Sequence, residues 1–203
     1  MTVGGRTLLS YPVERAAATR GLRSLVVVAP QGYLDRHTWG LGALAEQVVV
    51  VAGGAQRSDS VRSGLAQIDP GCEVILIHDA ARAFTPTLVF DRVVAAVRIG
   101  VPAVAGVVPG LPVADTIKRV DGSDIVTDTP KRATLRAVQT PQGFRADVLR
   151  AAYTSARVAT DDAALVELLG HRVRVVEGDP LAFKVTTPED LARAEQLVAG
   201  WRQ

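Results

Sequence analysis

Short apolar runs recur along the first half of the chain, separated by longer stretches of mixed polarity. Four runs are rich in Val, Leu, Ile and Ala and are followed closely by Pro, Gly or Asp: 25–29, 48–51, 73–77 and 102–108. Such short, nearly unbroken runs predict strands of a parallel sheet that is buried on both faces. The stretches between them predict helices at about 8–19, 59–67 and 86–99. We therefore expect an α/β fold with a Rossmann-like, doubly wound, mostly parallel sheet.

The pattern changes at Pro109. Two short alternating runs flank Asp121-Gly122 and predict a β-hairpin, whose faces carry too few apolar residues for a core element. We interpret 111–132 as a dimerisation arm that projects from a single domain spanning 1–203; a hairpin folded back on its own domain is the alternative. Beyond the arm, we expect strands at 135–138, 173–176 and 181–185, a turn at 140–144, and helices at 145–153, 162–169 and from Thr187-Pro188 onwards.

Composition narrows the class of protein. Of 203 residues, 48% are apolar and 4% aromatic, so Val, Ala and Leu must build the core. A net charge of +2 is too small to indicate binding to nucleic acid or to a membrane surface. The single cysteine, Cys72, excludes an intramolecular disulfide and a cysteine cluster for zinc. No run has the length of a membrane span and the first 23 residues lack the apolar core of a signal peptide, so we expect a cytoplasmic protein.

Two stretches carry candidate chemistry. His78-Asp79-Ala80-Ala81-Arg82 follows a predicted strand, so Asp79 stands at the sheet edge where it could hold a divalent metal, and Arg82 could reach a phosphate. A turn-capping Asp79 and a solvated Arg82 are the alternative. Gly53-Gly54 lies between a strand and a helix, where a ligand can approach the backbone and the first helical amides favour an anion. A plain turn is the alternative there.

Five motifs follow one another along the chain: Gly53-Gly54 with Arg57-Ser58-Asp59-Ser60-Val61, His78-Asp79-Ala80-Ala81-Arg82, Asp115-Thr116-Ile117-Lys118, Gln139-Thr140-Pro141-Gln142, and Phe183-Lys184-Val185-Thr186 with Pro188-Glu189-Asp190. In this order they resemble one family, the 2-C-methyl-D-erythritol 4-phosphate cytidylyltransferases of non-mevalonate isoprenoid synthesis. The likeness runs from about residue 4 to residue 198. It implies transfer of CMP from CTP to the sugar phosphate, release of pyrophosphate, help from Mg²⁺, and a homodimer.

The resemblance also implies roles for single residues. The metal ligand would be Asp79, and the catalytic residues would be Asp79, Lys184 and Arg132. The nucleotide would be bound by Gly53, Gly54, Ser60 and Ala80. The methylerythritol phosphate would be bound by Asp79, Arg82, Thr116, Arg132, Thr140 and Lys184, several of them from the arm of a partner copy.

Elementary chemistry agrees with these roles. Phosphoryl-type transfer needs positioning and charge neutralisation more than a covalent nucleophile. Arg132 could hold the attacking phosphate in a two-pronged contact, and Lys184 could neutralise it as a point charge. A surface ion pair is the alternative for Lys184.

The chain departs from the family pattern at its start. Family members begin with a strand and a glycine-rich loop that carries Arg and Lys and wraps the triphosphate. Here Gly4-Gly5-Arg6 matches the segment just after that loop, so both features are absent from this numbering. We expect 25–29 and 74–77 to lack a packed neighbour, and triphosphate binding to lose its main electrostatic support.

Several explanations of this departure stay open. The native protein could start further upstream, or the sequence could cover only part of the molecule. An inactive sugar-phosphate-binding paralogue is a third possibility. A cytidylyltransferase for another polyol phosphate, such as ribitol phosphate, is a separate alternative, because Arg82, Thr116 and Arg132 would bind either phosphate.

Overall fold

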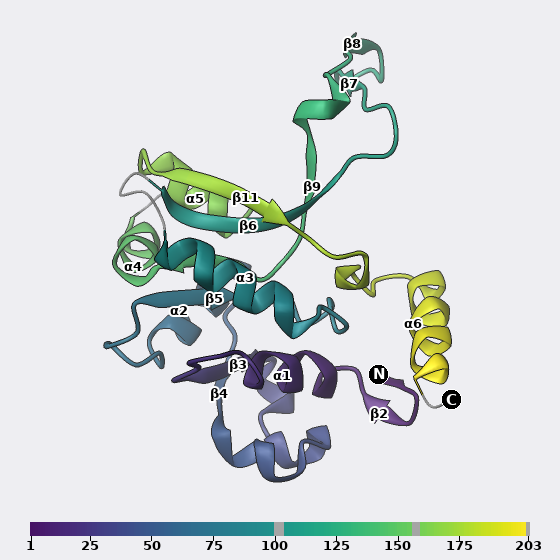
Figure 1. Cartoon of the computed structure of the whole chain (residues 1–203). Coiled ribbons are helices and arrows are strands. Elements are labelled where there is room, and N and C mark those ends of the chain that lie inside the picture. The colour runs from purple at the N-terminus through teal and green to yellow at the C-terminus, as the bar shows by residue number, and fades with distance from the viewer. Residues whose placement is uncertain (100–103, 156–158, 202–203) are drawn as a thin grey trace.

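The predicted α/β fold is confirmed (Figure 1). The structure, a computed structural model, describes residues 1–99, 104–155 and 159–201. Strands β11, β6 and β5 run in one direction, because β6 is parallel to β11 while β6 and β5 are both antiparallel to β10. The larger sheet contains, in spatial order, β11 (Arg172–Glu177), β6 (Val104–Pro112), β10 (Gln142–Arg145) and β5 (Val74–Ile77), with β9 (Arg136–Val138) paired to the far end of β6.

Helices cover both faces of this sheet. On one face, Val74 and Leu76 pack with residues of α3, whereas Ile75 packs on the opposite face with α4 and α5. A Cβ atom on Gly143 of β10 would lie 2.4 Å from Val93 Cγ1, so glycine is what lets α3 approach the sheet. The helices are α3 (Thr87–Arg98), α4 (Ala146–Thr154) and α5 (Asp162–Leu168).

A second, two-stranded sheet forms the lower part of the molecule in Figure 1. Its strands β3 (Leu25–Ala29) and β4 (Val48–Ala52) are parallel. Between them the chain forms three 3₁₀ segments. Trp39 at the end of the second segment, and Leu41 just before the third, pack with Val48. The helices next to this sheet are α1 (Ser10–Ala17) and α2 (Arg57–Leu65).

The two sheets face each other across a cleft between β3 and β5. Within the described residues, β3 pairs with β4 alone and β5 pairs with β10 alone. The cleft, about 520 Å³ in volume, is lined by residues 25–28 of β3 and 75–77 of β5. The expectation that these two strands lack a packed neighbour is therefore confirmed.

Two local predictions were wrong. Residues 142–145 form β10, a strand inside the larger sheet, where we expected a turn. The polar Gln142 and the small Gly143 hid this strand, because Gly143 makes room for α3 and contributes no apolar side chain of its own. Residues 181–185 are no strand: a 3₁₀ turn (Pro180–Ala182), in which the Asp179 carboxylate accepts the Leu181 N–H, leads into an extended segment. The predicted strand 102–108 begins outside the described residues and continues to Pro112.

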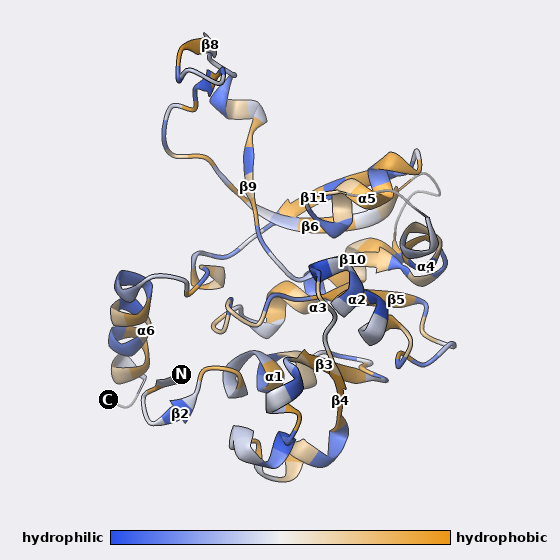
Figure 2. Ribbon diagram, turned by 180° about the vertical axis from the view of Figure 1, so that it is seen from behind, coloured by the Kyte–Doolittle hydropathy of each residue, from blue (hydrophilic) through white to orange (hydrophobic). Residues whose placement is uncertain are grey.

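The predicted hairpin is confirmed. Strands β7 (Arg119–Val120) and β8 (Val126–Asp128) are antiparallel and project from the body of the molecule (Figure 1). Seen from behind, apolar residues gather at the tip near β8 (Figure 2). Ile125 is 64% exposed and Val126 53%, so the arm carries apolar surface that its own chain leaves uncovered.

The two ends of the chain pack together. A short hairpin of β1 (Thr2–Val3) and β2 (Arg6–Thr7) lies against α6 (Pro188–Gly200), and Val3 and Val198 share a core cluster. The predicted start of α6 is confirmed, with Thr187 as N-cap and Pro188 in the first turn. No helix in the described part of the chain is long and apolar enough to cross a bilayer.

Hydrogen exchange should reveal the open edges of β3 and β5. We expect every second amide of β3 and β5 to exchange much faster than those of β6, because β6 is hydrogen-bonded between β11 and β10. Exchange measured by NMR on the intact chain checks this. Equal protection of all three strands would contradict it.

Candidate active site

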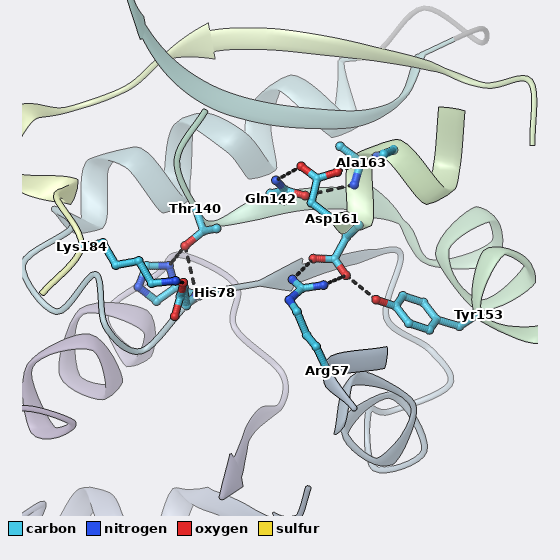
Figure 3. A network of polar contacts seen from close by, with 11 residues as sticks. Arg57, His78, Thr140, Gln142, Tyr153, Asp161, Ala163 and Lys184 are labelled. Carbon is cyan, nitrogen blue, oxygen red and sulfur yellow. Dashed lines mark hydrogen bonds and ion pairs between the residues drawn. The ribbon is translucent and has the colours of Figure 1, made fainter. Parts of the chain in front are cut away.

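An ion pair lies at the carboxyl end of β5. Lys184 Nζ lies 2.7 Å from Asp79 Oδ2, and the two side chains are 47% and 37% exposed. Lys184 reaches this position on the extended segment after the 3₁₀ turn, which the Val185 N–H fixes by donating to the Ala81 carbonyl (2.8 Å). Two predicted residues that are far apart in the sequence thus meet at one sheet edge. Figure 3 shows Lys184 beside His78 and Thr140 at this edge.

Thr140 holds Asp79 from the other side. Thr140 Oγ1 accepts the Asp79 N–H at 3.0 Å and lies 3.0 Å from Nδ1 of His78 (Figure 3). Burial lowers the pKa of His78 to about 4, so this ring is neutral at pH 7. His78 therefore has the structural character of a fixed hydrogen-bond partner.

The charge on Asp79 is favoured by its neighbours. Burial alone would raise the pKa of the carboxyl group. The hydrogen bond and charge of Lys184 outweigh burial, with help from the Ala81 N–H and the charge of Arg82, and the pKa is lower than usual. Asp79 is therefore an ionised acceptor at neutral pH, able to hold a cation.

Gln139 positions the segment that carries Lys184. Its side-chain amide donates to the Asp179 carbonyl (2.9 Å), and its Oε1 accepts the Asp179 N–H (3.0 Å). A Cβ atom on Gly178 would lie 2.3 Å from that Oε1, so the preceding glycine allows the contact. Because Gln139 directly precedes Thr140, one short segment holds both partners of the ion pair in place.

The guanidinium of Arg82 is directed toward backbone carbonyls. It donates to Ala182 (2.7 Å) and more weakly to Val138 (3.4 Å). Burial lowers the pKa of Arg82, and the charge of Asp79 opposes that effect. Arg82 is not among the residues that line the cleft, whereas Ala80 is. In this arrangement Arg82 braces the loop after β5, and its predicted phosphate contact stays a prediction.

The glycine loop is built around α2. Ser60 Oγ accepts the Gly54 N–H at 3.1 Å, and a Cβ atom on Gly54 would lie 2.3 Å from Asp59 Cβ. Gly53 donates its N–H to the Ala29 carbonyl at 2.9 Å. Ser60 and Ala80 line the cleft together with Asp79 and Lys184, so two of the predicted nucleotide residues share one cavity with the ion pair. Gly53 and Gly54 are not among the residues that line it.

Two predicted residues lie elsewhere. Thr116 and Arg132 are exposed on the arm, and neither lines the cleft of its own chain. Arg132 Nη1 donates to the Ala114 carbonyl at 2.6 Å. The structure therefore brings together Asp79, Ala80, Thr140, Lys184 and Ser60, and leaves these two apart.

One charged group near the cleft was missed by sequence reasoning. Arg57 lines the cleft and donates to both carboxylate oxygens of Asp162, which also accepts the hydroxyl of Tyr153 (Figure 3). The sequence held one signal for this pair: two acidic residues, Asp161 and Asp162, stand at the start of a helix. One carboxylate is enough to cap the helix, so the second was free to pair with a cation. Metal ligands do not cluster here: in the described ranges, His, Cys, Asp and Glu form no group of three or more that could hold an ion.

Comparisons with known proteins cover nearly the whole chain. A family model described as 2-C-methyl-D-erythritol 4-phosphate cytidylyltransferase (IspD) matches residues 1–200. The protein of that name from Nocardia farcinica is 50% identical over 97% of this chain and 83% of its own length, and that from Rhodococcus opacus is 50% identical over 97% and 84%. Among solved structures, the 4-diphosphocytidyl-2C-methyl-D-erythritol synthase of Anaerococcus prevotii has a TM-score of 0.86 at 27% identity, covering 98% of this chain and 88% of its own. The 2-C-methyl-D-erythritol 4-phosphate cytidylyltransferase of Thermus thermophilus has a TM-score of 0.80 at 36% identity, covering 98% and 91%.

Replacing Lys184 with Met should raise the pKa of Asp79, because burial then acts with less opposition. The ¹³C shift of the Asp79 carboxyl, followed by NMR against pH, measures this. Arg145→Met removes an exposed cation that is paired with Asp147 and does not line the cleft, and it should leave the titration of Asp79 unchanged.

The sign of the stability effect follows from the same shift. The contribution of Asp79 to the free energy of unfolding is fully present above its unfolded-state pKa and is lost as pH falls through the lower folded-state pKa. The difference between wild type and Lys184→Met should therefore shrink in acid. A difference that grows on acidification would contradict this assignment.

Proposed function

The chain belongs to the 2-C-methyl-D-erythritol 4-phosphate cytidylyltransferase family, and on that premise we propose that it transfers CMP from CTP to 2-C-methyl-D-erythritol 4-phosphate. A phosphate oxygen of the sugar phosphate forms a bond to the α-phosphorus of CTP, and the bond to pyrophosphate breaks. The observation that carries the proposal is the Asp79–Lys184 pair, which shares a cleft with Ser60 of α2, the residue that holds the glycine loop.

Charge neutralisation is the task of Lys184. Both substrates are anionic, so the reaction needs fixed positive charge where the two phosphates approach. Asp79 orients the ammonium, and Thr140 orients Asp79 through its main-chain N–H. Gly53, Gly54, Ser60 and Ala80 would hold the cytidine end of CTP, partly through backbone groups.

Mg²⁺ would be held by Asp79. A single carboxylate that is 37% exposed fits this ion, which commonly keeps several waters and binds through one or two carboxylates together with substrate phosphates. When bound, Mg²⁺ would supply Lewis-acid charge stabilisation to the phosphates. Lys184 already contacts one oxygen of Asp79, so the lysine and the metal would share this carboxylate.

The arm would complete the site of a second copy. We propose a single domain, 1–203, whose arm 111–132 forms a homodimer and places Thr116 and Arg132 in the partner's cleft. The exposed apolar side chains of Ile125 and Val126 support this, as does the position of Arg132 away from its own cleft. We also propose a cytoplasmic location for the enzyme.

A second candidate function is binding of a sugar phosphate without transfer. The open cleft between β3 and β5 favours it, because no glycine-rich loop with Arg and Lys lies beside that cleft in the residues that the structure describes. A transferase acting on another polyol phosphate is a variant of the first proposal.

Pyrophosphate release tests the proposal. Release should require CTP, methylerythritol phosphate and Mg²⁺ together, and Asp79→Asn should lower kcat by ~100-fold or more, as expected when charge stabilisation at the reacting group is lost. The control is Asp147→Asn, which should keep full activity. It removes an exposed carboxylate of α4 that is paired with Arg145. Sugar-phosphate binding without release would favour the second function. Faster release with ribitol phosphate than with methylerythritol phosphate would show that another polyol phosphate is the substrate.

Mixing two inactive variants tests the shared site. Asp79→Asn and Arg132→Ala should each be inactive alone. A heterodimer has one site with both native residues, so random mixing should restore about a quarter of the wild-type rate per site. Activity measured after co-refolding checks this. No recovery, with dimers verified by sedimentation, would mean that Arg132 does not serve a partner's cleft.

A further inference from the structure

Arg57 connects three helices beside the cleft. It is the first residue of α2, its side chain is 54% exposed, and it lines the cleft beside Ser60. Its guanidinium donates through Nη1 to Asp162 Oδ1 at 3.1 Å and through Nη2 to Oδ2. Tyr153 of α4 donates its hydroxyl to the same carboxylate at the start of α5 (Figure 3).

The carboxylate of Asp162 fixes Arg57 in place. Asp162 is 0% exposed, so its charge depends on protein partners. The hydrogen bond and charge of Asp162 raise the pKa of Arg57 against the effect of burial. Burial and the same negative charge raise the pKa of Tyr153. Removing Arg57 would leave a buried charge without its counter-ion, unlike the loss of an ordinary surface pair.

A second arginine joins the same helices. Arg62 Nε donates to the Tyr153 carbonyl at 3.1 Å, and its guanidinium carbon lies 5.9 Å from the centre of the tyrosine ring. Helix α2 is therefore attached to α5 through Arg57 and to α4 through Arg62. Arg150 of α4 also donates to the Leu65 carbonyl of α2 at 3.0 Å, and Leu65 packs in the core cluster that contains both partner helices. Of these three arginines, Arg57 is the one that lines the cleft.

These contacts cross the boundary between the two sheets. Helix α2 follows β4 of the smaller sheet, whereas α4 and α5 pack on the larger one. Strands β3 and β5 are not hydrogen-bonded to each other, so strand pairing does not set the distance between the two halves of the cleft. The Gly54 N–H is bonded to Ser60 on the first turns of α2, and any shift of the helix moves this loop with it.

We propose that Arg57 is a positioning residue: its pair with Asp162 holds the nucleotide half of the site, Gly54 and Ser60, at a fixed distance from Asp79 and Lys184. The ligand is taken to be CTP, and to that extent the inference rests on the proposed function. The pair determines affinity for the cytidine nucleotide and leaves the contacts of the sugar phosphate unchanged.

Paired substitutions separate positioning from stability. Arg57→Met should lower Tm strongly, because Asp162 is left buried and unpaired. The double variant Arg57→Met/Asp162→Asn removes that charge and should regain most of the lost Tm. Its Kd for CTP, measured by calorimetry, should still be about tenfold or more above the wild-type value. Gly54 and Ser60 are still present in this variant, but contact groups that are out of position bind the ligand less well. KM for methylerythritol phosphate should not change.

A conservative variant keeps the test decisive if the double variant remains unstable. Arg57→Lys keeps the counter-charge and loses the two parallel hydrogen bonds, so Tm should fall little while CTP affinity falls between wild type and the double variant. Wild-type affinity for CTP in either stable variant would overturn the inference and leave Arg57 with a structural role alone.

The matched control uses an exposed pair of the same kind. Arg145, at the end of β10, donates to Asp147 in the first turn of α4 at 3.3 and 2.6 Å. The double variant Arg145→Met/Asp147→Asn should leave both Tm and CTP affinity near wild type. Calorimetry also keeps the two proposals distinguishable. Wild-type CTP binding without pyrophosphate release would overturn the transferase alone, whereas wild type that fails to bind CTP would overturn both.

Discussion

Contacts between helices, and no shared strand, hold the larger sheet and the β3–β4 sheet at a common cleft. One side of the cleft presents Arg57 and Ser60 of α2, and the other presents Asp79 at the end of β5. Because β3 and β5 do not pair, the geometry of the site depends on side chains that reach from one layer to the other. An ion pair with a buried partner, such as Arg57 with Asp162, suits this task. Breaking it would leave the buried carboxylate without a counter-ion and out of contact with water, which is strongly unfavourable.

The segment 139–142 is the second structural requirement of the site. Gln139 holds the turn that delivers Lys184, and Thr140 holds the main chain of Asp79. Gln142 donates to Asp161 and accepts the Ala163 N–H, which fixes the start of α5. The polar side chains of this short segment thus connect parts of the chain that are distant in sequence. This explains why three hydrogen-bonding side chains occur at the start of β10 and in the residues just before it.

The sequence specified much of this fold and less of the site. Residues 25–29 and the start of α6 were predicted correctly, because an apolar run and a cap are local signals. The strand at 142–145 was missed, because its role depends on how closely α3 approaches Gly143. Asp79 and Lys184 were found through motif resemblance, whereas Arg57 with Asp162 was not, because partnership between residues 105 positions apart is decided by tertiary packing.

The position of Lys184 near the end of the chain has a consequence for biosynthesis. The nascent chain emerges from the ribosome with its amino end first. The early α/β elements can therefore begin to fold while later residues are still being added. The lysine that faces Asp79 emerges after the strands of the larger sheet and of the β3–β4 sheet, and after the arm. A nascent or truncated chain could therefore hold a folded sheet with an unpaired carboxylate at its edge. The charge of Asp79 is balanced only after the segment that carries Lys184 has been synthesised.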